Sequence, residues 1–221
     1  MSSVRKPLPK ISGLLVGGFI AAIACLAVFA NLAEDVIEPG TISFDQTAGD
    51  LLRGVAAPWL TRGMIAVTEL GSLYVLLPLF VIVVGYLWFR LHRFWEAMMF
   101  VISGIGSLAL NVILKQLFQR SRPDLQHLVE AGGYSFPSGH AMVAAGSYGM
   151  LGYLIWYFLR KQGRPNWYVP ILTVAWVLLI GVSRVYLGVH YASDVLAGFA
   201  AGGFWLLACI FALHLIRYYK S

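Results

Sequence analysis

Long apolar runs are the feature that most limits how this chain can fold. Hydrophobic residues make up 59% of the 221 residues and charged residues only 12%, about half of the charged fraction of a soluble domain. Several runs approach the roughly 20 apolar residues that a helix needs to cross a bilayer. The sequence therefore predicts an all-α, polytopic membrane protein, a six-transmembrane-helix bundle in a single domain, residues 1–221. The predicted transmembrane helices span about residues 11–32, 70–91, 95–118, 139–159, 168–186 and 192–216.

The first apolar run could also be interpreted as a signal peptide. It is longer than the apolar core of a typical signal peptide, and no A-x-A-like cleavage site closes it, which favours a transmembrane helix. An acidic, mixed segment follows, in which Phe44, Ala48, Leu51 and Val55 recur at helical spacing. This spacing predicts a short amphipathic helix on the outer side of the membrane. The alternative is a helix that packs on the bundle and has no role toward lipid.

The positive charges lie mostly on one side of the predicted bundle. Six helices place ten of the sixteen Lys and Arg residues on the side of the two termini and six on the other side. Because cytoplasmic loops carry an excess of Lys and Arg, the sequence predicts cytoplasmic N- and C-termini. The ten residues are Arg5, Lys6, Lys10, Arg90, Arg93, Arg160, Lys161, Arg164, Arg217 and Lys220.

Neither the net charge nor the cysteines indicate a further partner. The net charge is +6, but no basic face or tail concentrates it, so we expect no nucleic-acid partner. Cys25 and Cys209 both fall inside apolar runs. We therefore expect them to be small packing residues rather than a disulfide or a metal-binding pair.

Three polar segments are expected at the outer end of the bundle. Residues 115–123 end the third predicted helix, residues 137–140 begin the fourth, and residues 183–194 join the fifth to the sixth. Together they supply three cations, two histidines and one carboxylate. Ionisable groups close to membrane depth are costly and are functional candidates by default.

The second of these segments has the features of an anion site. Pro137 suits the entrance to a helix, Ser138 is a favourable N-cap, and Gly139 lets a ligand approach the backbone. A helix N-terminus offers free N–H groups and a positive dipole end to an anion such as phosphate. The alternative is an ordinary capped helix with His140 on its surface, and the other two polar segments favour the anion site.

The three cations suit phosphoryl transfer. The transferred phosphoryl group spreads negative charge over three oxygens in its transition state, and Lys115, Arg122 and Arg184 could neutralise that charge. Asp194 is the only acidic residue close to the two histidines in the sequence. We therefore expect no metal and no cofactor.

The remaining polar residues fit the other roles in this chemistry. His190 and Asp194 are four residues apart. On a helix they would share a face, so that Asp194 could hold one ring nitrogen while the other attacks phosphorus. His140 could protonate the leaving oxygen. The hydroxyl of Ser138 and the backbone N–H of Gly139 or His140 could donate to the phosphoryl oxygens.

The combined pattern resembles a known family. It reads Lys-x6-Arg-Pro, then Pro-Ser-Gly-His, then Ser-Arg-x5-His-x3-Asp, and is similar to the signature of the type 2 phosphatidic acid phosphatase superfamily. That superfamily includes bacterial phosphatidylglycerophosphate and undecaprenyl-diphosphate phosphatases and shares its signature with glucose-6-phosphatase and vanadium haloperoxidases. All three motifs match without a gap or a substitution. The resemblance also covers the six-helix layout and residues 53–71.

The resemblance implies roles for the motif residues. It implies that His190 is the nucleophile and forms a phosphohistidine, that Asp194 orients it, and that His140 is the acid. It implies that no metal is required. The phosphate ligands that it implies are Lys115, Arg122, Ser138, Gly139 and Arg184.

The predicted function is the removal of a terminal phosphate from a lipid phosphate or diphosphate at the outer face of a bacterial plasma membrane. Phosphatidylglycerophosphate, undecaprenyl diphosphate and phosphatidic acid are the candidate substrates. A lipid phosphotransferase would use the same residues for its first half-reaction. A lipid transporter is disfavoured because its site usually lies at the membrane midplane, and a vanadate-dependent peroxidase because those relatives are soluble.

Two charged residues near the motifs keep two interpretations each. Glu69 could line the mouth of the site or cap the end of a helix. Arg120 lies between Lys115 and Arg122 and could bind a second phosphate or a headgroup, or be solvated.

Overall fold

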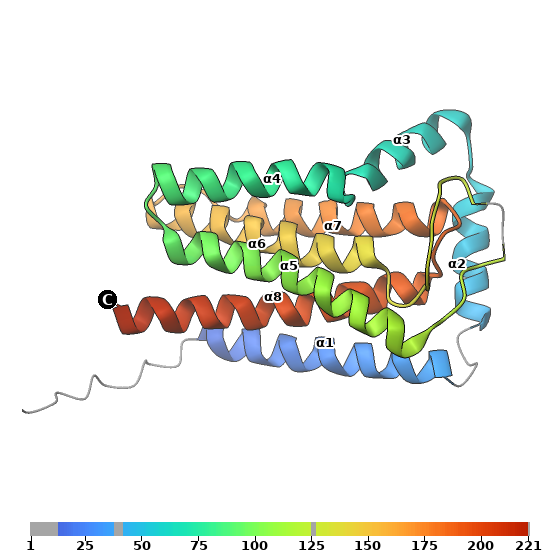
Figure 1. The fold of residues 1–221 in the computed structure, drawn as a ribbon, viewed down its shortest axis with the longest axis horizontal. Coiled ribbons are helices and arrows are strands. Elements are labelled where there is room, and N and C mark those ends of the chain that lie inside the picture. The colour runs from blue at the N-terminus through green and yellow to red at the C-terminus, as the bar shows by residue number, and fades with distance from the viewer. Residues whose placement is uncertain (1–12, 38–41, 125–126, 221) are drawn as a thin grey trace, which may run out of the picture.

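The computed structural model describes residues 13–37, 42–124 and 127–220, and this part of the chain is helical, without a strand (Figure 1). Six of its helices are long and apolar enough to cross a membrane, which confirms the predicted all-α, six-helix membrane fold. The helices are α1 (Gly13–Ile37), α2 (Ile42–Gly54), α3 (Pro58–Glu69), α4 (Leu73–Gly85), the π-helical turn η1 (Tyr86–Arg90), α5 (Phe94–Phe118), α6 (Gly139–Lys161), α7 (Tyr168–Tyr186) and α8 (Ala192–Lys220).

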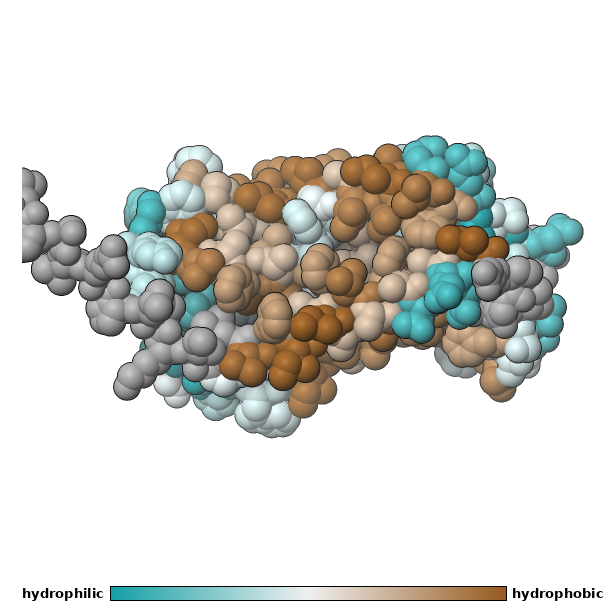
Figure 2. Space-filling view, turned by 90° about the horizontal axis from the view of Figure 1, so that it is seen from below, coloured by the Kyte–Doolittle hydropathy of each residue, from teal (hydrophilic) through white to brown (hydrophobic). Residues whose placement is uncertain are grey.

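The surface of the bundle is apolar in its middle. Figure 2 shows hydrophobic residues across the centre of one face, with hydrophilic residues gathered toward both ends. Large apolar side chains are exposed along the membrane helices, among them Phe19 at 67% and Val81 at 73%. In water this exposure would be costly, whereas in a bilayer it faces lipid.

Glycines bring the central helices together. α6 packs against α5, α7 and α8. A Cβ atom at Gly146 of α6 would lie 2.1 Å from the Ser107 hydroxyl of α5, and one at Gly202 of α8 would lie 2.5 Å from the carbonyl oxygen of Met142. Small residues at such crossings allow close helix contact in membranes. The polar ends of α5, α6 and α8 are therefore held at short range from one another.

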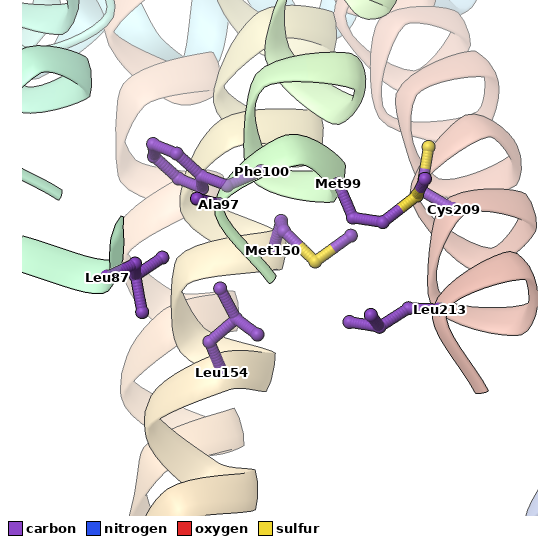
Figure 3. Packing of buried hydrophobic residues seen from close by; sticks show 8 residues of the cluster. All are labelled: Leu87, Ala97, Met99, Phe100, Met150, Leu154, Cys209 and Leu213. Carbon is purple, nitrogen blue, oxygen red and sulfur yellow. The ribbon is translucent and has the colours of Figure 1, made fainter. Parts of the chain in front are cut away.

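The apolar core lies toward the end of the bundle where α8 ends. Both cysteines are free, and Cys209 is buried in this core, in agreement with its predicted packing role. α1 packs mainly against α8, makes a smaller contact with α5, and has little of its span buried. The core cluster, drawn in Figure 3, consists of Leu87, Ala97, Met99, Phe100, Met150, Leu154, Cys209 and Leu213.

The other end of the bundle gathers the polar segments. In Figure 1, α2, α3 and the loop after α5 lie at this end, while the C-terminus lies at the opposite end together with the start of α1. α2 is amphipathic, as predicted, and contacts α7 and α8. The three motif segments therefore meet under α2 and α3.

Candidate active site

Buried aromatic contacts and a backbone hydrogen bond position the start of α6. Phe136 is fully buried, and its ring lies 5.0 Å from that of Phe118 and 5.8 Å from that of Phe29. The peptide bond between Phe136 and Pro137 is cis. The backbone N–H of Ser138 donates to the carbonyl oxygen of Asp194 at 2.9 Å. These contacts tie the N-terminus of α6 to the first turn of α8.

Ser138 differs from the sequence prediction in one respect. It occupies the N-cap position of α6, but its side chain makes no capping hydrogen bond. Its hydroxyl is fully buried and finds no partner among the described residues. Buried polar groups are nearly always hydrogen-bonded, so this hydroxyl is available to a ligand.

The His190 and Asp194 side chains are in contact. His190 Nδ1 lies 3.3 Å from Asp194 Oδ2, and both residues are almost completely buried. The sequence argument required a helix across both residues, but α8 begins only at Ala192. The contact forms because the Tyr191 N–H also donates to Asp194 Oδ2, at 2.9 Å, which folds the preceding loop over the first turn of α8.

Arg122 fixes the other side of the His190 ring. Its guanidinium donates to the carbonyl oxygens of Val189, at 2.7 Å, and Gly132, at 2.7 Å, and lies 3.3 Å from His190 Nε2. A guanidinium can only donate, so Nε2 is the acceptor and Nδ1 carries the proton toward Asp194. Burial lowers the pKa of His190 to about 4, although Asp194 raises it. The ring is therefore neutral at pH 7, with its lone pair on Nε2.

Two further cations lie close to Arg122. Lys115, in the last turn of α5, donates to the carbonyl oxygens of Tyr134 and, at 3.4 Å, Ser135. Arg184 is 5% exposed and donates to the Thr68 hydroxyl at 2.6 Å. The charges of Lys115, Arg122 and Arg184 act on one another. Three cations held together at one end of the bundle concentrate the positive charge that an anion site requires.

His140 lies in the first turn of α6, next to the turn between α3 and α4. A Cβ atom at Gly71 would lie 3.0 Å from His140 Cδ2. Arg184, Arg122 and Lys115 are all close enough to act electrostatically on His140. The structure thus brings both motif histidines to the same group of cations.

Glu69 lies at the edge of this site. It is exposed, it is the last residue of α3, and its charge acts on Arg184. An acidic side chain is unfavourable at a helix C-terminus, so this position does not fit the capping interpretation. It fits a residue at the mouth of the site.

Sequence reasoning did not predict the contacts that Ser135, Arg120 and Asp45 make around Asp194. Ser135 and Arg120 contact Asp194 directly, and Asp45 contacts it through Arg120. The Ser135 hydroxyl donates to Asp194 Oδ2. Arg120 pairs with Asp194 at 2.6 Å and with Asp45 of α2 at 2.8 Å. Its bonds go to protein carboxylates and its side chain is only 16% exposed, so the solvated interpretation of Arg120 is wrong. The sequence carried no signal for this pairing, because 75 residues separate Asp45 from Arg120.

A bundle of membrane helices with a His–Asp pair and three cations at one polar end defines a membrane-embedded enzyme of phosphate chemistry. Residues 96–217 match the PAP2 superfamily, so the chain belongs to that superfamily, as its motifs predicted. It is a multi-pass membrane protein, and its homologues identify it as a lipid phosphatase.

Two curated relatives show where the similarity lies. The chain is 33% identical over 180 residues to phosphatidylglycerophosphatase B of Bacillus subtilis, covering 81% of this chain and 88% of the relative. It is 33% identical over 112 residues to the undecaprenyl-diphosphatase of Sulfolobus acidocaldarius, covering 48% of this chain and 49% of the relative.

Two crystal structures have the same fold. The PAP2-type phosphatidylglycerolphosphate phosphatase from Bacillus subtilis is similar with a TM-score of 0.80 and 30% identity, over 91% of this chain and 98% of that one. LpxE from Aquifex aeolicus is similar with a TM-score of 0.58 and 24% identity, over 75% of this chain and 92% of that one. The second similarity supports the fold alone.

Proposed function

We propose that this protein removes the terminal phosphate from a lipid phosphate or diphosphate through a phosphohistidine on His190. The observation that carries the proposal is the state of His190. Its Nδ1 faces Asp194 and its Nε2 faces Arg122, so a neutral ring directs its lone pair toward the cations. This is the arrangement required for a histidine nucleophile.

In the first step, Nε2 of His190 attacks phosphorus and the bond from phosphorus to the lipid oxygen breaks. His140 gives its proton to that departing oxygen. The proposed phosphate ligands are Lys115, Arg122, Ser138, Gly139 and Arg184; their charges and N–H or O–H donors stabilise the equatorial oxygens.

In the second step, water attacks the phosphohistidine. His140, now the base, takes a proton from the water, and the phosphorus–nitrogen bond breaks. Inorganic phosphate leaves, and His190 returns to its neutral form with Asp194 at Nδ1. The two histidines thus return to their starting states after one turnover.

We propose that this reaction needs no metal ion. In the described ranges, no three His, Cys, Asp or Glu side chains lie together in a way that could hold one. The three cations supply the positive charge that a metal would otherwise provide.

The proposed setting is a bacterial plasma membrane, with cytoplasmic termini and the site on the extracytoplasmic side, and with residues 1–221 forming one phosphatase domain. The excess of Lys and Arg on the side of the termini supports this orientation. The relative with the longest match reported above acts on phosphatidylglycerophosphate by its name, which favours that lipid over undecaprenyl diphosphate and phosphatidic acid. The polar groups gather at one end of the bundle, which argues against a transporter with a site at the midplane.

The test measures both the released phosphate and the phosphoenzyme intermediate. Purified protein in detergent is given phosphatidylglycerophosphate, undecaprenyl diphosphate or phosphatidic acid, and released phosphate is measured. Rapid quenching of the reaction with ³²P-labelled lipid should trap an acid-labile phosphoenzyme, which His190→Ala should abolish. Release of inorganic phosphate without an added acceptor supports the hydrolase; a phosphoenzyme that forms but turns over only when an acceptor lipid or sugar is added would identify the phosphotransferase alternative. A trapped phosphoenzyme in His190→Ala would refute the assignment of the nucleophile.

A further inference from the structure

The two oxygens of Asp194 have different partners. Oδ2 lies 3.3 Å from His190 Nδ1 and accepts from the Ser135 hydroxyl and from the Tyr191 N–H. Oδ1 accepts from Arg120 Nη1 at 2.6 Å. Arg120 therefore holds the side of the carboxylate that faces away from His190.

Arg120 is itself held by α2. Its Nη2 donates to Asp45 Oδ2 at 2.8 Å, and its guanidinium lies 4.1 Å from the centre of the Tyr191 ring. Burial lowers the pKa of Arg120, but the charges of Asp194 and Asp45 outweigh it and the pKa is raised. Arg120 is thus a fixed cation between two carboxylates.

Asp45 also accepts two hydrogen bonds from the start of α8. Its Oδ1 accepts from the Ser193 N–H at 2.8 Å and its Oδ2 from the Ser193 hydroxyl at 2.7 Å. Asp45 is only 5% exposed. A carboxylate is buried in this way only when charge and hydrogen bonds satisfy it, and here they come from Arg120 and from the residue next to Asp194.

We propose that Asp45 and Arg120 are positioning residues that orient Asp194 toward His190. The proposal rests on the proposed phosphohistidine chemistry. In the described structure the polar side-chain contacts of Arg120 are to Asp45, Ser193 and Asp194, and Asp45 contacts none of the proposed phosphate ligands. The pair therefore acts on the nucleophile through Asp194 and not on the substrate.

Removing the charge of Asp45 and removing the charge of Arg120 should shift the pKa of His190 in opposite directions. In Asp45→Asn, Arg120 keeps only Asp194 as an ionic partner and can turn both of its Nη atoms toward that carboxylate, which draws Asp194 away from His190. In Arg120→Gln, Asp194 loses its cation and its negative charge acts more strongly on His190. Loss of a negative charge lowers the pKa of a histidine and loss of a positive charge raises it.

The experiment measures phosphoenzyme formation and steady-state kinetics in full-length protein with phosphatidic acid as the probe lipid. Asp45→Asn should lower kcat by roughly 10- to 100-fold, the effect typical of losing a group that orients a metal-binding histidine, while KM stays within about twofold. The acid limb of the pH profile of kcat/KM should move to lower pH in Asp45→Asn and to higher pH in Arg120→Gln. Ionisation of the substrate is the same in each variant, so differences between their pH profiles report on the enzyme. The other charges that act on His190, those of Asp194, Arg122 and Arg184, are unchanged in these variants.

The matched control is Asp50→Asn. Asp50 lies on the same helix and pairs with Arg53 at 2.8 Å, but its side chain is 76% exposed. This change should leave kcat, KM and the pH profile as they are in the unmodified protein. If the unmodified protein forms the phosphoenzyme, an Asp45→Asn variant with the same kcat, KM and pH profile as Asp50→Asn would overturn the proposal. If the unmodified protein forms no phosphoenzyme, the proposed function itself fails.

A second variant covers a loss of folding. Asp45→Asn/Arg120→Gln removes both charges of the Asp45–Arg120 pair, so neither is left buried without the other, while Asp194 keeps its hydrogen bonds from Ser135 and Tyr191. It should fold with a reduced kcat and an unchanged KM. A kcat equal to that of the unmodified protein would contradict the proposal. Loss of folding in both variants, judged by their melting temperatures, would also contradict it, because the pair would then hold α2 to the bundle without positioning Asp194.

Discussion

Gly71→Ala should impair the proposed acid while leaving the nucleophile in place. The added Cβ atom would lie 3.0 Å from His140 Cδ2 and 2.9 Å from Ile180 Cγ2, whereas ordinary contacts begin near 3.4 Å. The His140 ring or the turn must therefore move by about 0.4 Å. Because a misplacement of 1 Å can cost about 10²-fold in rate, a shift of this size corresponds to roughly five- to tenfold.

The loss should depend on the leaving group. The alkoxide of phosphatidic acid leaves poorly without a proton, whereas p-nitrophenolate leaves without help. We expect Gly71→Ala to lower kcat for phosphatidic acid by roughly five- to tenfold and for p-nitrophenyl phosphate by less than about twofold. Phosphate release with each substrate in the same detergent measures both.

Gly63→Ala is the control for this change. Gly63 lies within α3, and a Cβ atom there meets nothing within 4 Å, so both rates should stay as they are. Equal losses on the two substrates in Gly71→Ala would refute the reasoning, because they would show that the turn supports the whole site and not His140 in particular.

Four further outcomes are expected. His140→Ala should slow phosphatidic acid hydrolysis by about 10²- to 10⁴-fold and p-nitrophenyl phosphate hydrolysis much less; equal losses, together with an acid-labile phosphoenzyme that persists in His190→Ala, would reverse the roles of the histidines. Activity should survive EDTA and be inhibited by vanadate, and restoration by Mg²⁺ after a loss in EDTA would contradict this. In intact cells an impermeant thiol reagent should label Glu130→Cys and not Gln162→Cys; the opposite result would invert the topology. The pKa of His190 is lowered by burial from 6.5 to about 4, so its neutral form stabilises the fold above pH 6.5 and this contribution is lost as the pH falls toward 4; the melting temperature should fall more over that range than in His190→Gln.

The sequence predicts the membrane fold because apolar length is a local property. Each membrane span can be recognised without its neighbours, and the structure has helices long enough to cross a membrane where the apolar runs lie. The short helix α2 was likewise predicted from the spacing of its apolar residues. Its partner in the bundle was not predicted, because an amphipathic pattern states which face is apolar but not what covers the polar face.

The site was predictable to the extent that its residues are close in sequence or share a motif. His190 and Asp194 are four residues apart, and the contact between them was predicted. Asp45 contacts Ser193 across 148 residues, and no periodicity or spacing relates them. The Ser138 hydroxyl shows another limit, because preference for the N-cap position says nothing about whether the capping bond forms.

The pairing of α1 with α8 has a consequence for biogenesis. α1 is the first described helix to be synthesised and α8 the last, yet each is the other's neighbour in the bundle. α1 is therefore inserted in the lipid well before its main partner, α8, has been synthesised. Its apolar sequence makes it stable there, since only 6% of its span is buried even in the finished protein. Asp194 arrives with α8, so a nascent chain halted before that helix would be inserted in the bilayer but lack the carboxylate that faces His190.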